Sequence, residues 1–157
     1  MIYNCRPVLV DYKVKLFDVG SWLSGLIKLF TRCKYNHSAL MFDMGGKTFV
    51  AEARSAGVVV ATLREWKRHR PDKKWITGFA LREIKTERVA YSFGVPYDVK
   101  SLFQQAIFIT TGKWIGEHNL EQVNCSEVVA FYYNLPQPWL WTAAKLYKSD
   151  SFKWHVL

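Results

Sequence analysis

The stretch HSALMFDMGGKTFVAEA, residues 37–53, decides the fold of this chain. Two strand-like runs stand on either side of Gly45 and Gly46, and a glycine pair in that position predicts a β-hairpin. His37 opens the first run and Glu52 lies near the end of the second. The two residues are fifteen positions apart, an odd separation. A single-turn hairpin is therefore expected to pair them directly and to place both side chains on one face.

The segments around the hairpin predict further strands. Residues 7–14 alternate well enough to form an initial strand, and the β-branched run that begins at Gly57 favours a third strand. Thr62 is expected to cap a short helix that follows it. Residues 75–83 alternate again and predict one more strand.

Helical spacing of apolar residues occurs before and after these strands. Residues 97–109 follow the sequence GVP and predict a helix, and residues 125–134 predict another, which LPQPW terminates. The tail from residue 139 onward is rich in aromatic residues but weakly patterned. The expected fold class is α+β, a central antiparallel sheet with flanking helices, in a single domain of residues 1–157.

An apolar stripe at helical spacing within residues 21–32 has two interpretations. Packing at the core or its rim is favoured. A helix on a membrane surface is the alternative, because aromatic and basic residues flank the stripe, which is too short to span a bilayer. The apolar members are Trp22, Leu23, Leu26, Ile27 and Phe30.

The charge of the chain predicts attraction to anionic surfaces without choosing among them. Lys and Arg number 22 against 13 Asp and Glu, a formal charge of +9. The densest basic segment covers residues 64–74, and a solvated surface is favoured there over a nucleic-acid patch, since no nucleic-acid-binding motif accompanies it. Its candidate contacts with an anionic surface are Arg64, Lys67, Arg68, Arg70, Lys73 and Lys74.

Three cysteines, Cys5, Cys33 and Cys125, stand far apart in the sequence. Their odd number and the absence of a CxxC spacing argue against a disulfide framework or a zinc ribbon and fit a reducing compartment. The N-terminus lacks the features of a secretory signal. We expect a protein that is cytoplasmic or released without a signal peptide, is not transmembrane, and needs no metal or other cofactor.

Cys125, in VNCSEVVAFYY, stands at the start of a predicted helix. Asn124 or Ser126 can cap this helix, and Glu127 suits its first turn. Unpaired backbone N–H groups and the helix dipole favour a thiolate at that position, and the same N–H groups can stabilise an oxyanion. A small buried structural cysteine is the alternative, which position by itself does not exclude.

His37 and Glu52 can supply the partners of such a thiol. A carboxylate bound to one imidazole nitrogen selects the tautomer and leaves the other nitrogen to accept the thiol proton. A histidine bound to an acid for structural reasons fits the spacing equally well.

The order of the motifs NHSAL, VAEA, GVVV, GVPYD and NCSEVV resembles that of a known superfamily. It is similar to circularly permuted members of the NlpC-type, papain-like superfamily, in particular the YiiX-like group of cysteine hydrolases. The resemblance covers roughly residues 7–134 and implies a circularly permuted papain-like fold, in which the histidine strand precedes the cysteine. RPVLVDY replaces the Gly-Asp pair that usually precedes the first strand.

The resemblance implies a role for each matching residue. Cys125 corresponds to the nucleophile, His37 to the general base and acid, and Glu52 to the acid that orients the imidazole. Tyr97, in GVPYD, corresponds to a tyrosine that helps to hold the oxyanion or the substrate, although an aromatic residue packed at a helix start explains it equally well.

Two functions follow as expectations. The first is a thiol-dependent hydrolase or acyltransferase that acts on an amide, ester or thioester, with cell-wall peptide or lipid acyl substrates. The alternative is a non-catalytic basic module that engages nucleic acid, an anionic membrane surface or a protein partner. Five other candidates are expected outside the site: His69, His118 and His155 as surface histidines, and Cys5 and Cys33 as structural thiols.

Overall fold

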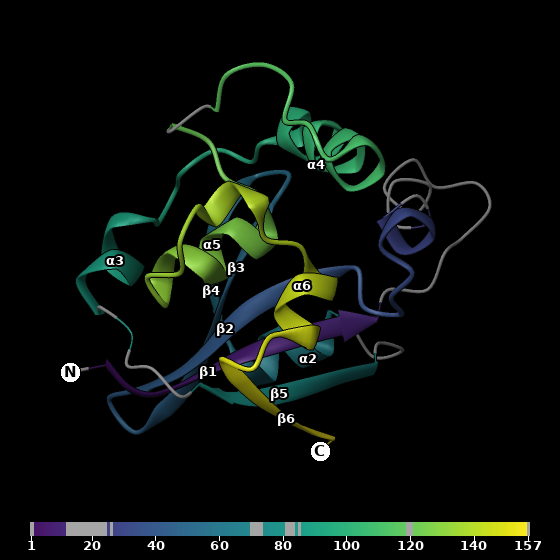
Figure 1. Ribbon diagram of the computed structural model, residues 1–157. Helices are drawn as coiled ribbons and strands as arrows, with labels where there is room; N and C mark the ends of the chain where they lie inside the picture. Colours follow the sequence, from purple (N-terminus) through teal and green to yellow (C-terminus); the bar gives the residue numbers. More distant parts are fainter. Residues whose placement is uncertain are drawn as a thin grey trace.

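The computed structural model describes residues 2–11, 25, 27–69, 74–80, 84, 86–118 and 121–156. Within this part of the chain, six strands form one sheet in the order β4-β3-β2-β1-β5-β6, and each neighbouring pair is antiparallel. Helices lie on both sides of the sheet (Figure 1). The predicted α+β class, a central antiparallel sheet with flanking helices, is confirmed.

The predicted strands are present, and the structure adds one that was missed. β1 begins earlier than expected, whereas β6, in the weakly patterned tail, was not predicted and pairs with β5 at the sheet edge. The expected ends of β1 and β5, residues 12–14 and 81–83, lie outside the described residues. The strands are β1 Ile2–Asp11, β2 His37–Met44, β3 Lys47–Arg54, β4 Gly57–Thr62, β5 Lys74–Ala80 and β6 Phe152–Val156.

The helices predicted after Thr62, at residues 97–109 and at residues 125–134 form, whereas α3, η1 and α6 were not predicted. Thr62 caps the short helix as expected, in a capping box with Glu65. Asp98 caps α4, and Gly112 ends it in the left-handed conformation. The helices are α2 Leu63–Arg68, α3 Thr86–Tyr91, α4 Val99–Thr111, α5 Cys125–Tyr132, the 3-10 turn η1 Pro138–Leu140 and α6 Ala143–Lys148.

The β2–β3 hairpin forms as predicted, but its register differs from the expected one. Gly45 and Gly46 both have positive φ, as a type I′ turn requires, and Leu40 pairs with Ala51. Continuing that register places Glu52 opposite Ala39, so His37 and Glu52 are diagonal neighbours on one face and are not directly paired. A diagonal separation of about 7–8 Å between Cα atoms still lets long side chains meet.

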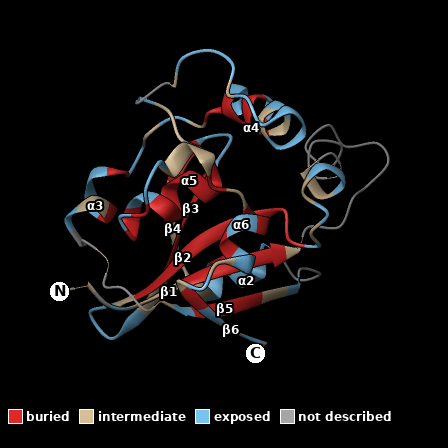
Figure 2. Cartoon of the chain, in the orientation of Figure 1, coloured by how far each residue is buried: buried red, intermediate tan, exposed pale blue. Residues whose placement is uncertain are grey.

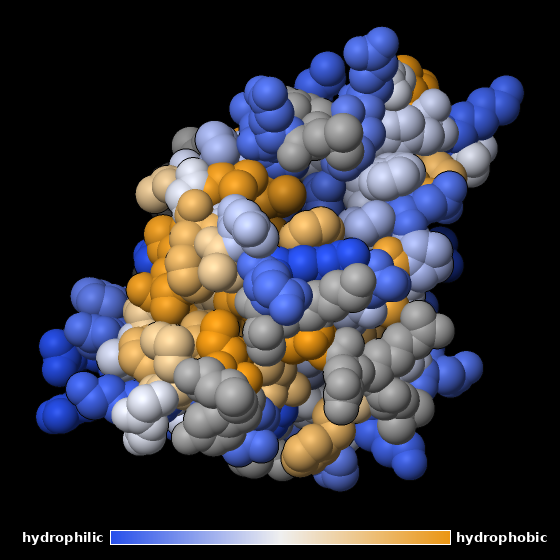
Figure 3. All heavy atoms as spheres, turned by 90° about the vertical axis from the view of Figure 1, so that its left-hand side faces the viewer, coloured by the Kyte–Doolittle hydropathy of each residue, from blue (hydrophilic) through white to orange (hydrophobic). Residues whose placement is uncertain are grey.

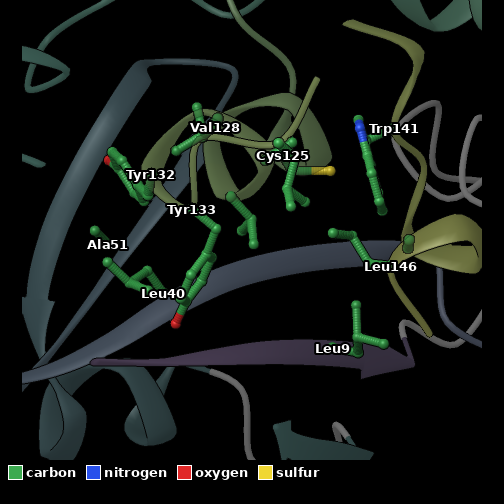
Figure 4. Packing of buried hydrophobic residues seen from close by; sticks show 14 of the residues in the cluster. Leu9, Leu40, Ala51, Cys125, Val128, Tyr132, Tyr133, Trp141 and Leu146 are labelled. Atoms are coloured by element: carbon green, nitrogen blue, oxygen red, sulfur yellow. The ribbon is translucent and has the colours of Figure 1, made fainter. Parts of the chain in front are cut away.

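The sheet buries a core on each face. On one face, α5 packs over β2 and β3 with nearly all of its residues buried, and Figure 4 shows Tyr132, Tyr133, Leu40 and Ala51 in this core. On the other face, Trp66 of α2 is buried in a second cluster. α5 is therefore held by a large apolar contact, and its first residue has a defined position relative to the sheet.

The apolar stripe predicted in residues 21–32 is described only in part. Residues 27–31 are helical, while Trp22, Leu23 and Leu26 lie outside the described residues. No helix in the described part of the chain is long and apolar enough to cross a membrane.

Gly57 and Gly94 allow a test of how β4 is joined to the segment before α4. Both have positive φ, but an added methyl group would meet the Val95 carbonyl oxygen at 2.8 Å at Gly57 and nothing within 4 Å at Gly94. We expect Gly94→Ala to lower the free energy of unfolding by about 1–2 kcal/mol, because of its backbone conformation. Gly57→Ala should cost measurably more in urea unfolding, and equal costs would contradict a close backbone contact at Gly57.

Candidate active site

His37 and Glu52 form a buried pair at the start of β2. Nε2 of His37 lies 2.9 Å from Oε2 of Glu52, and the Glu52 side chain is 1% exposed. Nε of Arg54 lies 3.5 Å from the other carboxylate oxygen. Both oxygens of Glu52 thus have a partner, as a carboxylate removed from water requires.

Cys125 is the first residue of α5, and Asn124, which caps that helix, is buried. Oδ1 of Asn124 accepts hydrogen bonds from the backbone N–H groups of Ser126 and Glu127, at 3.0 and 3.1 Å. Nδ2 of Asn124 donates to Oγ of Ser101 in α4 at 2.9 Å. Because Asn124 is completely buried, these bonds hold the cysteine in place with little freedom.

His37 and Ser38 of β2 are residues of the sheet that interact with the Cys125 thiol. Burial raises the pKa of Cys125, but the charge of His37, a hydrogen bond to its side chain and the backbone N–H of Ser38 outweigh it and lower the pKa to about 7. A hydrogen bond of 3.2 Å between the hydroxyls of Ser38 and Ser126 joins the same two elements. The thiol is therefore poised to ionise near neutral pH, in spite of its burial.

The tautomer of His37 follows from these contacts. Because Nε2 faces Glu52, Nδ1 is the ring nitrogen that remains for the thiol of Cys125. Three residues from three elements, β2, β3 and α5, thus meet in one place in the order sulfur, imidazole, carboxylate. This arrangement can move a proton from the sulfur to the ring and hold the resulting imidazolium against the carboxylate.

A narrow, mainly apolar pocket opens beside Cys125. It has a cavity volume of about 50 Å³, and its described lining comes from α4, from the helical residues 27–31 and from the start of α6. Asn36 and Ser126 are among its polar lining residues, and Oγ of Ser126 lies 3.9 Å from the sulfur of Cys125. Figure 4 shows the sulfur directed away from Val128 and Tyr132 in the core.

Tyr97 pairs with the segment just before Cys125 but does not belong to the described lining of this pocket. It forms an isolated parallel β-bridge with Val123 and packs against the core. It is not among the described residues that line the pocket. Its predicted contact with the oxyanion or substrate stays a prediction.

His118 was expected on the surface, and that expectation is wrong. Its side chain is 14% exposed, and its Nε2 lies 3.1 Å from Oε1 of Glu127. Its ring stacks on Trp139, with centroids 4.6 Å apart. The contact arises because the segment after α4 returns to the start of α5, which no local pattern in GEHNL indicates.

Glu127 is a buried acid that the sequence assigned only to the helix dipole. Burial raises its pKa to about 7, and the charges of Asp98 and Cys125 act in the same direction. Its Oε2 accepts a hydrogen bond from the backbone N–H of Asn124 at 3.3 Å. Glu127 therefore completes the capping box of α5 and ties His118 to the helix start.

The remaining candidates lie away from this cluster. His69 and His155 are exposed, as expected. Cys5 and Cys33 are half-buried against the main core, and burial raises the pKa of Cys5 to about 11, which suits an unreactive thiol. Arg64, Lys67, Arg68 and Lys74 are exposed on and beside α2, whereas Arg70 and Lys73 lie outside the described residues.

Comparison with known proteins supports the fold. The sequence matches no family model and no curated protein. The structure is similar to the crystal structure of metalloprotein yiiX (DUF1105) from Escherichia coli O157:H7, with a TM-score of 0.55 and 15% sequence identity, over 96% of this chain and 94% of that chain. At this identity the likeness shows a common fold that extends over nearly the whole of both chains.

That neighbour is a metalloprotein, so a metal site in this chain is the relevant comparison. The described residues contain no group of three or more His, Cys, Asp or Glu side chains arranged to hold a metal ion.

The ionisation of Cys125 can be measured by alkylation. In a chain with Cys5→Ser and Cys33→Ser, the rate of iodoacetamide labelling should rise with pH to a half-maximal value near pH 7, the pKa given by the contacts of Cys125. His37→Ala should move this midpoint above the ordinary thiol value of 9.0, because burial then acts against the thiolate with less opposition. An unchanged midpoint in His37→Ala would contradict the sulfur–imidazole contact.

The raised pKa of Glu127 has a consequence for stability. Between its ordinary pKa of 4.5 and about 7, the folded chain keeps this proton and the unfolded chain loses it, so the contribution of Glu127 to stability falls as pH rises through that window. Glu127→Gln keeps a hydrogen-bond acceptor and removes the titration. In urea unfolding, the variant should gain up to about 3 kcal/mol relative to the parent between about pH 4 and pH 8. The exposed Glu117→Gln serves as the matched control, and equal pH profiles for all three chains would contradict the burial of a titrating Glu127.

Proposed function

We propose that this protein is a thiol-dependent hydrolase or acyltransferase of the circularly permuted papain-like type, with a Cys125–His37–Glu52 triad. The observation that supports it is the convergence of a thiol of lowered pKa, an imidazole and a buried carboxylate from three separate elements. The similarity to the yiiX fold agrees with the family resemblance of the sequence motifs. In the chain, His37 and Glu52 precede Cys125, which is the permuted order.

The proposed reaction runs through an acyl-enzyme. The thiolate of Cys125 adds to the carbonyl carbon of an amide, ester or thioester and forms a C–S bond. His37, protonated at Nδ1, gives its proton to the leaving group as the C–N, C–O or C–S bond breaks. Water or an acceptor, deprotonated by His37, then attacks the thioester and releases Cys125. Glu52 acts as a positioning residue that keeps the imidazole oriented.

The amide of Cys125 is the best oxyanion donor in the first turn of α5. The next two amides, those of Ser126 and Glu127, already donate to Asn124. Asn36, which lines the pocket beside the sulfur, can supply a second N–H. We propose Asn36 for this role in place of Tyr97, because Tyr97 is not among the described residues that line the pocket.

The pocket favours a lipid acyl group over a cell-wall peptide as the acyl part of the substrate. Its walls include Ile27, Phe30, Leu102, Phe103, Ala106 and Ile109. A narrow space with such walls suits an unbranched hydrocarbon chain, whereas a charged peptide would lose its hydration there without compensating partners.

A non-catalytic basic module is the second candidate. The exposure of Arg64, Lys67, Arg68 and Lys74 leaves these cations available to nucleic acid, an anionic membrane or a protein partner. This function does not need the triad, so substitution of Cys125 would leave it intact.

The proposal can be tested by trapping the acyl-enzyme. Incubation with p-nitrophenyl esters should add one acyl group to Cys125, detected by intact mass and peptide mapping, and an octanoyl ester should react faster than an acetyl ester. His37→Ala should slow acylation by at least about 100-fold, the usual contribution of a general base. Cys33→Ala is the matched thiol control and should react like the parent. Acylation that is equally fast in His37→Ala, or spread over all three cysteines, would refute the triad.

The oxyanion assignment has its own test. Asn36→Ala should lower kcat about 100-fold with little change in KM, because it removes a donor that acts in the transition state. Tyr97→Phe, which removes one hydroxyl, should change kcat much less. The reverse ranking would assign the donor to Tyr97 instead.

A further inference from the structure

α4 buries three of its polar side chains and exposes most of its large apolar side chains, with Leu102 as a buried exception. Ser101, Gln104 and Gln105 are buried, whereas Phe103 is 51% exposed and Ile107 is also exposed. Figure 2 shows the exposed stretches along α4. This is the inverse of the usual arrangement of a surface helix, in which the apolar side chains face the core.

The buried glutamines explain why the polar side of α4 faces inward. Nε2 of Gln104 donates to the carbonyl oxygens of Ile115 and Glu117, and Nε2 of Gln105 donates to those of Trp139 and Trp141. α4 thus ties down the segment that leads to His118 and the segment around η1. These bonds account for the exposure of the apolar side chains of α4, but they assign no function to it.

The exposed apolar side chains continue across the mouth of the Cys125 pocket. Phe30, Phe103 and Ile109 line the pocket and are at the same time exposed, and Leu29 is 70% exposed beside Phe30. We call the set Leu29, Phe30, Phe103, Ile107 and Ile109 the apolar rim. Large exposed apolar side chains gathered at and near a pocket mouth mark a surface that another apolar phase covers.

Cations adjoin the apolar rim. A second hollow shares Thr31, Ile109 and Thr142 with the Cys125 pocket, and Lys145 and Lys148 line it. Both lysines are exposed, and Asp150 is the acidic residue among the described lining. In a chain of net charge +9, an apolar rim with lysines at its border complements an anionic, apolar surface.

We infer that the apolar rim docks on an anionic lipid bilayer, with Leu29, Phe30 and Phe103 in the acyl boundary and Lys145 and Lys148 at the headgroups. The pocket mouth then faces the bilayer, so an acyl chain can reach Cys125 without crossing water. The delivery of substrate rests on the proposed function, whereas the docking itself does not.

Co-sedimentation with vesicles tests the docking without any turnover. The chain with Cys125→Ala should sediment with vesicles of phosphatidylglycerol and phosphatidylcholine, and much less with phosphatidylcholine alone. The pair Phe103→Ser and Ile107→Ser should weaken binding on the order of tenfold or more, since it removes two apolar side chains from the contact. Circular dichroism checks that the variants are folded.

The matched control is Phe93→Ser, an equally large side chain that is 47% exposed. Phe93 follows α3 in the chain. α3 lies on the left-hand side of Figure 1, which is the side shown in Figure 3, where apolar atoms also gather. This variant should bind vesicles like the parent. Loss of binding in Phe93→Ser, with retention in the α4 variant, would overturn the inference and move the contact to that face.

Charge variants separate the bordering lysines from the basic segment on α2. Lys145→Gln with Lys148→Gln should weaken binding to anionic vesicles, and added salt should have the same effect on the parent. Lys67→Gln with Arg68→Gln should have little effect, and a larger loss there would overturn the inference. Absence of vesicle binding by a chain whose Cys125 still forms an acyl-enzyme would overturn the docking and leave the proposed function standing. Vesicle binding without acylation would do the opposite.

Discussion

The first turn of α5 is the constraint on which the rest of the site depends. Asn124 holds two amides of that turn and reaches Ser101 of α4, while Ser126 bonds to Ser38 of β2. Glu127 closes the capping box and joins His118. A single helix start thus connects the sheet, α4 and the segment before α5. Since all of these groups except His118 are buried, most lost bonds would leave a polar group without water.

Burial opposes ionisation of the Cys125 thiol, and contacts with residues of the sheet outweigh that effect. A buried thiol resists deprotonation, yet the ring of His37 and the amide of Ser38 more than offset that penalty. Glu52 is only 1% exposed, so water does not solvate its carboxylate. The contact with His37 compensates for that lost solvation. The same low polarity that penalises an isolated charge strengthens the contacts within the cluster.

The prediction from sequence was accurate where one short segment contains its own signal. The glycine pair of the hairpin, the caps at Thr62 and Asn124, and the helix that begins at Cys125 are all local features, and they form as expected. The prediction failed where contacts between distant segments determine the structure. β6 depends on pairing with β5, the hairpin register differs by two residues from direct pairing of His37 with Glu52, and His118 is buried by a contact with α5. The apolar side of α4, which periodicity would direct to the core, is largely exposed because Gln104 and Gln105 are needed inside.

The sequence by itself determined the α+β class and the main elements, because turn chemistry, capping and periodicity act over a few residues, while its resemblance to a known superfamily indicated Cys125, His37 and Glu52 as a candidate triad. Only the tertiary structure decided that the sulfur meets the imidazole, that Glu127 and His118 form a second pair, and that exposed apolar side chains border the pocket. These outcomes depend on contacts between residues far apart in the chain, where burial and hydrogen bonding select one packing among the many that local preferences allow.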